Sequence, residues 1–141
     1  MISHRMKNDA IEKSEDVLVL ERLQALGVTL LSEWDTLVFL NHHGATLGTA
    51  AQIARLIGYN KAEIGAALHR LEALGLIQRS RDSQGIRLYH FSAPPEPSCY
   101  SCLLDLMSLA QNRMGRLLLL KNLKRPRQEL RRSRDSGLRL A

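Results

Sequence analysis

The sequence predicts a mainly α-helical fold with one small β-hairpin, and the first observation behind this is a pair of helix-start patterns. Thr49-Ala-Ala-Gln52 and Asn60-Lys-Ala-Glu63 each place Gln or Glu three residues after a short polar side chain. In such a capping box the two side chains bind exposed backbone N–H groups at a helix N-terminus. Gly58 stands between the two predicted helices, and Gly75 follows the second, where a left-handed end residue favours glycine. These residues predict two short helices joined by a tight turn.

The second observation is a strand-turn-strand pattern directly after these helices. Residues 76–79 and 87–91 have strand-like composition and flank the turn sequence Asp82-Ser83-Gln84-Gly85. Alternation places Tyr89 and Phe91 on one side of the second strand, and we expect Phe91 to be buried. A helix-turn-helix followed by a basic hairpin is a winged helix, a fold that most often binds DNA.

Two more helices are predicted before the helix-turn-helix. Residues 32–42 begin with the capping box Ser32-Glu-Trp-Asp35, whose Trp34 we expect in the core. Residues 1–13 are polar without a period, so we expect disorder there, and Thr46-Leu47 is a candidate short strand. The first helix is predicted over residues 14–26, before Gly27, with apolar residues at helical spacing: Val17, Leu20, Leu23 and Leu26.

The second helix of the helix-turn-helix, predicted from Lys61 to Leu74, has two unlike faces. One face is apolar and is expected to pack into the core: Ile64, Leu68, Leu71 and Leu74. The opposite face is small or polar, which lets a helix backbone approach DNA closely: Lys61, Ala62, Gly65, Ala66 and His69.

A long helix is predicted over residues 98–123, after the stiff segment Ala93-Pro-Pro-Glu-Pro97. Leu117 to Leu120 is a continuous apolar run, too much for a solitary exposed helix. A second chain, the first helix or both would cover it. We therefore expect a homodimer formed through one stripe: Leu103, Leu106, Met107, Ala110, Met114, Leu117, Leu118 and Leu120.

The net charge of +6 lies wholly in the last part of the chain. Residues 1–120 hold twelve Lys/Arg and twelve Asp/Glu, whereas residues 121–141 hold eight basic and two acidic residues. Such a tail either gathers phosphates without reading sequence or is a solvated end that keeps the protein soluble. The expected division is 1–13 disordered, 14–31 N-terminal helix, 32–93 winged helix, 98–123 dimerisation helix and 124–141 basic tail.

Several classes of protein are excluded by what the sequence lacks. Its apolar runs are too short to span a bilayer, and its first residues lack the apolar segment of a signal peptide. We therefore expect a cytoplasmic protein with reduced cysteines. Glycine-rich phosphate loops of Walker or Rossmann spacing and a nucleophile–base set are also missing, so we expect neither an enzyme nor a cofactor.

Cys99-Tyr-Ser-Cys102 is a second candidate site. Its place at a helix start favours thiolates, so a redox switch is one interpretation. Half of a metal site is another, with His42, His43 or His90 as further ligands. The third interpretation is ordinary packing of two small apolar groups, which we favour because a second C-x-x-C is missing. We expect no bound metal.

Residues 32–92 resemble winged-helix transcriptional regulators of the broad MarR-like or ArsR-like kind. Two segments carry most of the resemblance: Thr49-Ala-Ala-Gln-Ile-Ala-Arg-Leu-Ile-Gly58 and Ile64-Gly-Ala-Ala-Leu-His-Arg-Leu-Glu-Ala-Leu-Gly-Leu-Ile77. The resemblance implies a homodimer held by terminal helices. MarR-type wings usually carry Asp-Arg-Arg near the tip, whereas the tip here reads Arg81-Asp82-Ser83-Gln84-Gly85, with Arg87 beyond it.

The sequence therefore predicts a homodimeric transcriptional regulator that binds double-stranded DNA by sequence or by DNA shape. One alternative is a winged helix used for protein contact in a larger assembly, since base-reading side chains are few; another is a thiol- or metal-responsive DNA-binding sensor. The sequence does not reveal an operator, an effector or the direction of regulation. The expected DNA contacts are Thr49, Asn60, Lys61, Ala62, Gly65, Ala66, His69, Arg70, Arg79, Arg81, Gln84 and Arg87.

Overall fold

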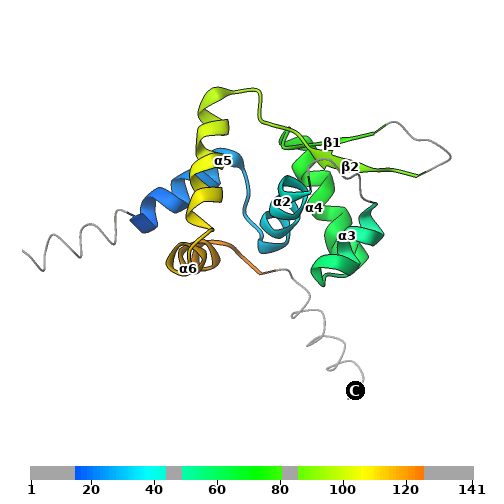
Figure 1. The fold of residues 1–141 in the computed structure, drawn as a ribbon, viewed down its shortest axis with the longest axis horizontal. Helices are drawn as coiled ribbons and strands as arrows, with labels where there is room; N and C mark the ends of the chain where they lie inside the picture. Colours follow the sequence, from blue (N-terminus) through cyan, green and yellow to red (C-terminus); the bar gives the residue numbers. More distant parts are fainter. Residues whose placement is uncertain (1–14, 44–48, 81–85, 126–141) are drawn as a thin grey trace, which may run out of the picture.

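The computed structural model describes residues 15–43, 49–80 and 86–125, and helices dominate them (Figure 1). The expectations for residues 1–13, Thr46-Leu47, Arg81, Gln84 and the tail beyond residue 125 lie outside the described residues. The N-terminal helix, over residues 15–26, is followed by α2 (Leu31–His42), α3 (Ala50–Ile57), α4 (Lys61–Ala73), β1 (Ile77–Arg79), β2 (Tyr89–Phe91), α5 (Pro97–Leu109) and α6 (Arg113–Asn122).

The elements gather into two groups around one continuous core. The N-terminal helix, α5 and α6 lie on one side of the molecule, and α2, α3, α4 and the hairpin lie on the other (Figure 1). Leu23, Leu37, Leu68 and Leu106 are all fully buried and belong to one hydrophobic cluster that spans both groups. The predicted fold class, mainly α with a small hairpin, is confirmed. Among the described residues, every helix is too short or too polar to cross a membrane.

The hairpin is antiparallel, with Ile77 opposite Phe91 and Arg79 opposite Tyr89. Ile77 is 2% exposed and fixes the hairpin to the core. Phe91 is half-buried rather than fully buried, since it packs against the edge of the hydrophobic cluster.

The helix-turn-helix has the predicted end residues. Thr49 Oγ1 accepts from the Gln52 backbone N–H at 3.2 Å, and Gln52 Oε1 accepts from the Thr49 N–H at 3.1 Å. Asn60 Oδ1 caps α4 through the Glu63 N–H at 2.8 Å, but Glu63 accepts from the Asn60 side-chain amide instead of its backbone. Gly58 has φ +83°, a left-handed conformation that glycine adopts without strain.

The apolar face of the N-terminal helix differs from the expectation. Val19, Leu23 and Leu26 are 1–4% exposed, whereas Val17 is 51% and Leu20 is 40% exposed. The buried face of the helix is formed by Val19, Leu23 and Leu26, at a spacing of four and then three residues. Val17 and Leu20, which the sequence placed on the buried face, therefore lie in solvent. In α4 the predicted core residues Ile64, Leu68 and Leu71 are fully buried, as expected. The fourth, Leu74, is half-buried.

The start of α2 is also corrected. The helix begins at Leu31 with Leu30 as its N-cap residue, so Ser32 lies inside the helix and is 3% exposed. Glu33 Oε1 accepts from the backbone N–H groups of Thr29 at 3.0 Å and Leu30 at 3.2 Å. The glutamate therefore supplies the acceptor that a capping hydroxyl would otherwise supply.

The single long C-terminal helix that the sequence predicts is two helices. α5 ends at Leu109, and α6 begins at Arg113 with Asn112 as its cap, whose Oδ1 accepts from the Gly115 N–H at 2.6 Å. A Cβ at Gly115 would lie 1.8 Å from the Leu109 carbonyl oxygen. The glycine lets the two helices approach at this turn, which a plain apolar stripe does not predict.

Candidate nucleic-acid interface

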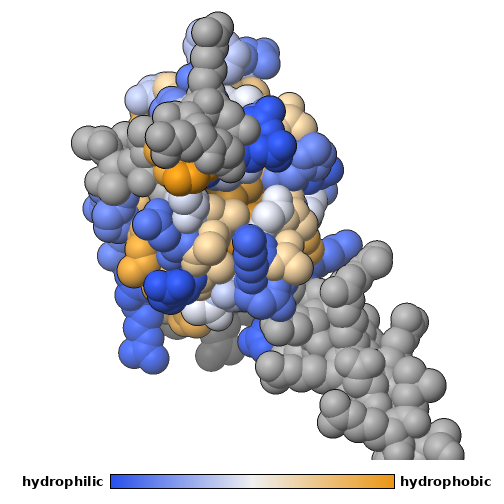
Figure 2. Space-filling model, turned by 90° about the vertical axis from the view of Figure 1, so that its right-hand side faces the viewer, coloured by the Kyte–Doolittle hydropathy of each residue, from blue (hydrophilic) through white to orange (hydrophobic). Residues whose placement is uncertain are grey.

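The outer face of α4 is the candidate interface. Lys61, Ala62, Ala66 and His69 are exposed, and Gly65 is half-buried. The inner face of the same helix is inserted into the core, so its orientation is determined by packing. The side of the molecule that carries α3 and the hairpin presents hydrophilic residues around small apolar ones, as Figure 2 shows. The sequence placed this face correctly because helical periodicity alone separates its two sides.

The turn between α3 and α4 is fixed by a contact that the sequence analysis missed. The Tyr59 hydroxyl donates to Asp35 Oδ2 of α2 at 2.6 Å. Burial raises the pKa of Asp35, and the hydrogen bond from Tyr59 acts against that rise. Burial, and then the Asp35 carboxylate, raise the pKa of Tyr59 well above its ordinary value, so its hydroxyl stays protonated as a donor.

The expected wing cations lie in different settings. Arg87 is exposed and lies two residues before β2. Arg79, in β1, has its Nε 3.5 Å from Glu72 Oε2 of α4, with both side chains partly exposed. Arg79 therefore also links β1 to α4.

Thr49 and Asn60 lie at the N-termini of α3 and α4, with their side-chain oxygens used as caps. Both side chains are thus committed first to the helix starts. Any DNA contact from them would come from the remaining donors or from the backbone.

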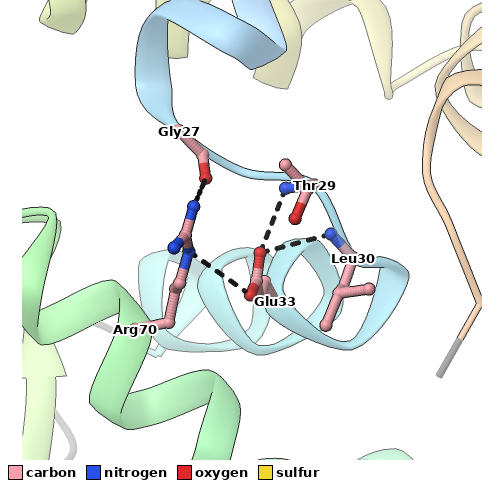
Figure 3. A network of polar contacts seen from close by, with 5 residues as sticks. All are labelled: Gly27, Thr29, Leu30, Glu33 and Arg70. Atoms are coloured by element: carbon pink, nitrogen blue, oxygen red, sulfur yellow. Dashed lines mark hydrogen bonds and ion pairs between the residues drawn. The ribbon is translucent and has the colours of Figure 1, made fainter. Parts of the chain in front are cut away.

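Arg70 departs from the expected DNA-facing set, as Figure 3 shows. Its Nη2 donates to the Gly27 carbonyl oxygen at 3.1 Å, and its Nε lies 3.8 Å from Glu33 Oε2. The guanidinium is directed toward Gly27, in the loop before α2, and toward Glu33 in the first turn of α2. Sequence reasoning assigned it by type and missed Glu33, because no local pattern marks a partner 37 residues away.

Comparison with known proteins shows which winged-helix proteins this chain resembles. A model described as the MarR family matches residues 26–86. A MepR–DNA complex from Staphylococcus aureus is similar at 20% identity and TM-score 0.52, over 77% of this chain and 82% of that chain. A second MepR structure, described as a transcription regulator of the Staphylococcus aureus multidrug efflux pump MepA, is similar at 17% identity and TM-score 0.52, over 99% of this chain and 96% of that chain. YusO from Bacillus subtilis is similar at 18% identity and TM-score 0.53, over 99% and 93%. No curated protein matches significantly.

The matched residues cover α2, α3, α4 and β1, so the similarity to the MarR family lies in the winged helix. The match confirms the predicted resemblance to winged-helix regulators of the MarR-like or ArsR-like kind, and the matching model is the MarR one. At identities of 17–20%, the similarity to solved structures shows the fold alone.

The cysteines lie outside the MarR-type winged helix, on the first turns of α5. Both are free and half-buried, and the Cys99 thiol lies 3.9 Å from the Ala25 carbonyl oxygen and 3.7 Å from Glu96 Oε2. Burial, followed by the negative charge of Glu96, raises the pKa of Cys99. The expectation that the helix start favours a thiolate is therefore wrong for Cys99. Within the described ranges, no three His, Cys, Asp or Glu side chains gather at a spacing that would hold a metal ion.

The expected dimerisation stripe is divided by the fold of the chain itself. Leu103 is 1% and Leu106 is 0% exposed, so both belong to the core of the single chain and not to a free surface. Met107, Ala110 and Leu118 are half-buried against that core. Large apolar side chains of the same helices nevertheless remain in solvent: Tyr100, Leu104, Met114, Leu117 and Leu120, together with Val17, Leu18 and Leu20.

Proposed function

We propose that the protein is a cytoplasmic DNA-binding transcriptional regulator that inserts α4 into the major groove of double-stranded DNA. The observation that carries this proposal is the outer face of α4, where small side chains and the polar side chains of Lys61 and His69 remain in solvent. A groove admits a helix backbone closely where its side chains are short. The likeness to a MepR–DNA complex supports the same placement.

The proposed DNA-facing set combines the exposed face of α4 with further residues that the sequence predicts to contact DNA. It includes the α4 face, the caps Thr49 and Asn60, and the wing residues Arg79, Arg81, Gln84 and Arg87. The α4 face offers few long polar side chains that could read base edges, so we infer that shape and deformability of the DNA contribute to site selection.

We also propose that the protein acts as a homodimer. Exposed apolar side chains of the N-terminal helix, α5 and α6 lie on the side of the molecule opposite α3 and the hairpin. Joining two chains through that side would remove these groups from water and leave both α4 helices outward.

Fluorescence anisotropy with labelled duplexes at several salt concentrations tests the DNA-binding proposal. Replacing Lys61 and Arg87 together by alanine removes two proposed phosphate contacts, and the slope of log affinity against log salt should fall by about two units. Arg113→Ala is the matched control, because Arg113 is an exposed cation on α6, away from the winged helix. If the parent binds no duplex even at low salt, the alternative of a protein-contact module becomes the better explanation.

A further inference from the structure

We propose that Arg70 is a positioning residue that fixes the orientation of α4 relative to the N-terminal helix and makes no DNA contact of its own. The proposal rests on the proposed function, since orientation matters only if α4 enters DNA. Arg70 lies on α4, yet its guanidinium contacts Gly27, which precedes α2, and Glu33, which lies in the first turn of α2 (Figure 3). Those two contacts use the rigid fork of donors that distinguishes Arg from Lys.

Glu33 supplies the buried carboxylate of this ion pair, whereas the Arg70 side chain remains 50% exposed. The Glu33 side chain is only 3% exposed, and a buried carboxylate requires hydrogen-bond donors and an opposite charge. One oxygen, Oε1, accepts from two backbone N–H groups at the start of α2, and the other faces the Nε of Arg70. In the part of the chain that the structure describes, Arg70 is the cation that pairs with this carboxylate.

The segment 27–31 that receives these contacts is the joint between the N-terminal helix and the winged helix. Its backbone is also paired with the C-terminal segment: Leu31 N–H donates to the Lys124 carbonyl at 2.7 Å, and Lys124 N–H donates to the Thr29 carbonyl at 2.9 Å. The joint therefore contacts α2, α4 and the chain after α6 at once. Its conformation is determined by all three.

The side chain of Leu74 also packs closely on this joint. A Cβ at Gly27 would lie 2.5 Å from Leu74 Cδ2, at a position where φ is +85°. Leu74 supplies an apolar contact without direction, whereas Arg70 supplies directed ones. Without Arg70, the turn of α4 about this contact would be less restricted.

This orientation determines the geometry of a two-fold dimer. Each α4 is tied to its dimerising helices through the joint, so a rotation there changes the separation of the two recognition helices. Half-sites on DNA lie about 34–36 Å apart, and both helices must fit them together. Arg70 would thus influence affinity for a paired site without touching DNA.

The first test measures DNA affinity and its salt dependence for Arg70→Ala, Glu33→Gln and the double variant. Each single change should weaken binding to a preferred site by about tenfold, with the salt slope unchanged. The double variant should be little weaker than either single one, because both changes break one contact. Arg70→Lys should restore part of the affinity, since its ammonium reaches Glu33 but lacks the fork. Lys61→Ala is the contrast, and should flatten the slope by about one unit.

The second test needs no DNA. Nitroxide labels at Glu21→Cys on the N-terminal helix and Ala66→Cys on α4, in a Cys99→Ser/Cys102→Ser background, report the distance across the joint. Labelled chain is diluted with unlabelled chain so that only the distance within one chain is measured. The parent should give a narrow distribution, and Arg70→Ala should broaden or shift it while circular dichroism keeps the helix content.

The outcomes are distinguishable. An unchanged distance distribution overturns the positioning role, whatever the DNA results. A salt slope that falls by about one unit in Arg70→Ala, with Glu33→Gln binding as the parent does, would identify Arg70 as a phosphate contact instead. Failure of the parent to bind any duplex overturns the proposed function, while the distance measurement still decides whether Arg70 fixes α4.

Discussion

At the scale of single residues, two polar contacts determine how the helix-turn-helix sits on the rest of the molecule. Tyr59 donates to Asp35, and Arg70 donates to Gly27 and lies beside Glu33. Each contact joins residues that are far apart in the sequence and replaces water at a partly or fully buried carboxylate. Such contacts give direction to an interface that is otherwise apolar.

Tyr59→Phe should lower the free energy of unfolding by about 1–2 kcal/mol near neutral pH, because Asp35 loses a hydrogen bond to a charged acceptor. Burial raises the pKa of Asp35 in the folded protein above its ordinary value. The stability linked to this carboxyl is therefore present at low pH and is lost as pH rises through the folded pKa. The effect of Tyr59→Phe should accordingly shrink at a pH below 3.8, the ordinary pKa of aspartate, because the raised pKa keeps Asp35 protonated there.

Urea unfolding of the parent and the variant at the two pH values measures this difference. Tyr100→Phe is the matched control, since Tyr100 is 39% exposed on α5 and its change should leave stability nearly as it is. An equal loss at both pH values would show that the ionised carboxylate is not the partner that matters.

The local signals in the sequence were enough for the helix starts at Thr49 and Asn60 and for the outer face of α4. A capping box and a helical period involve residues within one or two turns, so neighbouring letters contain all the information. The partners Asp35 and Glu33 could not be found in that way, because contacts over tens of residues depend on the packing of whole helices. The same holds for the hydrogen bond from Arg70 to the carbonyl oxygen of Gly27, which lies 43 residues earlier in the chain.

At the scale of elements, the turn between α5 and α6 shows the limit of apolar periodicity. Leucines continue through residues 103–120, and their spacing predicts one helix. The break depends on Asn112 as a cap and on Arg116, whose Nη1 donates to the carbonyl oxygens of Ala110 and Gln111, each at 3.3 Å. These residues are polar signals inside an apolar stripe, and in retrospect Asn112 three residues before Gly115 was the available sign.

Gly115→Ala should destabilise the protein by about 3 kcal/mol, because its Cβ would meet the Leu109 carbonyl oxygen, and backbone yields less readily than a side chain. Thermal or urea unfolding measures this loss. Gly65→Ala is the matched control in another helix: nothing lies within 4 Å of the Cβ it would add. That variant should gain about 0.5–1 kcal/mol, since alanine is the better helix former. Equal effects at the two glycines would contradict the close approach of α5 and α6.

At the scale of the whole molecule, the distribution of apolar surface separates the two proposed interfaces. Among the described residues, the winged helix presents small and polar groups with Leu56 and Ile86 as exposed large apolar side chains, whereas α5, α6 and the N-terminal helix leave eight such side chains in solvent. In the proposed homodimer, each chain would therefore contact DNA through one side and its partner chain through the opposite side.

Replacing Met114 and Leu117 by glutamate should convert the proposed dimer to a monomer. The two side chains are 70% and 51% exposed and lie three residues apart on α6, so the folded chain tolerates polar groups there. Dimer affinity should weaken by more than about thirtyfold, as for central apolar contacts. Sedimentation at micromolar concentration gives the mass. Leu56→Glu, at a 69% exposed leucine of α3, should keep the parent's mass. A parent that is already monomeric would rule out the dimer.

The last prediction concerns the basic tail and uses the place where the structure anchors it. Leu123 is 6% exposed and Lys124 pairs with the joint before α2, so the chain is part of the fold up to this point. A truncation meant to remove only charge must therefore end after Arg125. Residues 126–141 hold five basic and two acidic residues, which would add affinity for phosphate without selecting sequence.

Truncation after Arg125 should weaken binding to all duplexes by a similar factor and lower the salt slope, while the thermal midpoint stays near that of the parent. Truncation after Asn122 removes Leu123 and Lys124 as well, so it should also lower the thermal midpoint. Anisotropy with a preferred and a random duplex separates the two effects. If the longer form loses its preference between these duplexes, the tail takes part in selecting the site, and its contribution is not electrostatic alone.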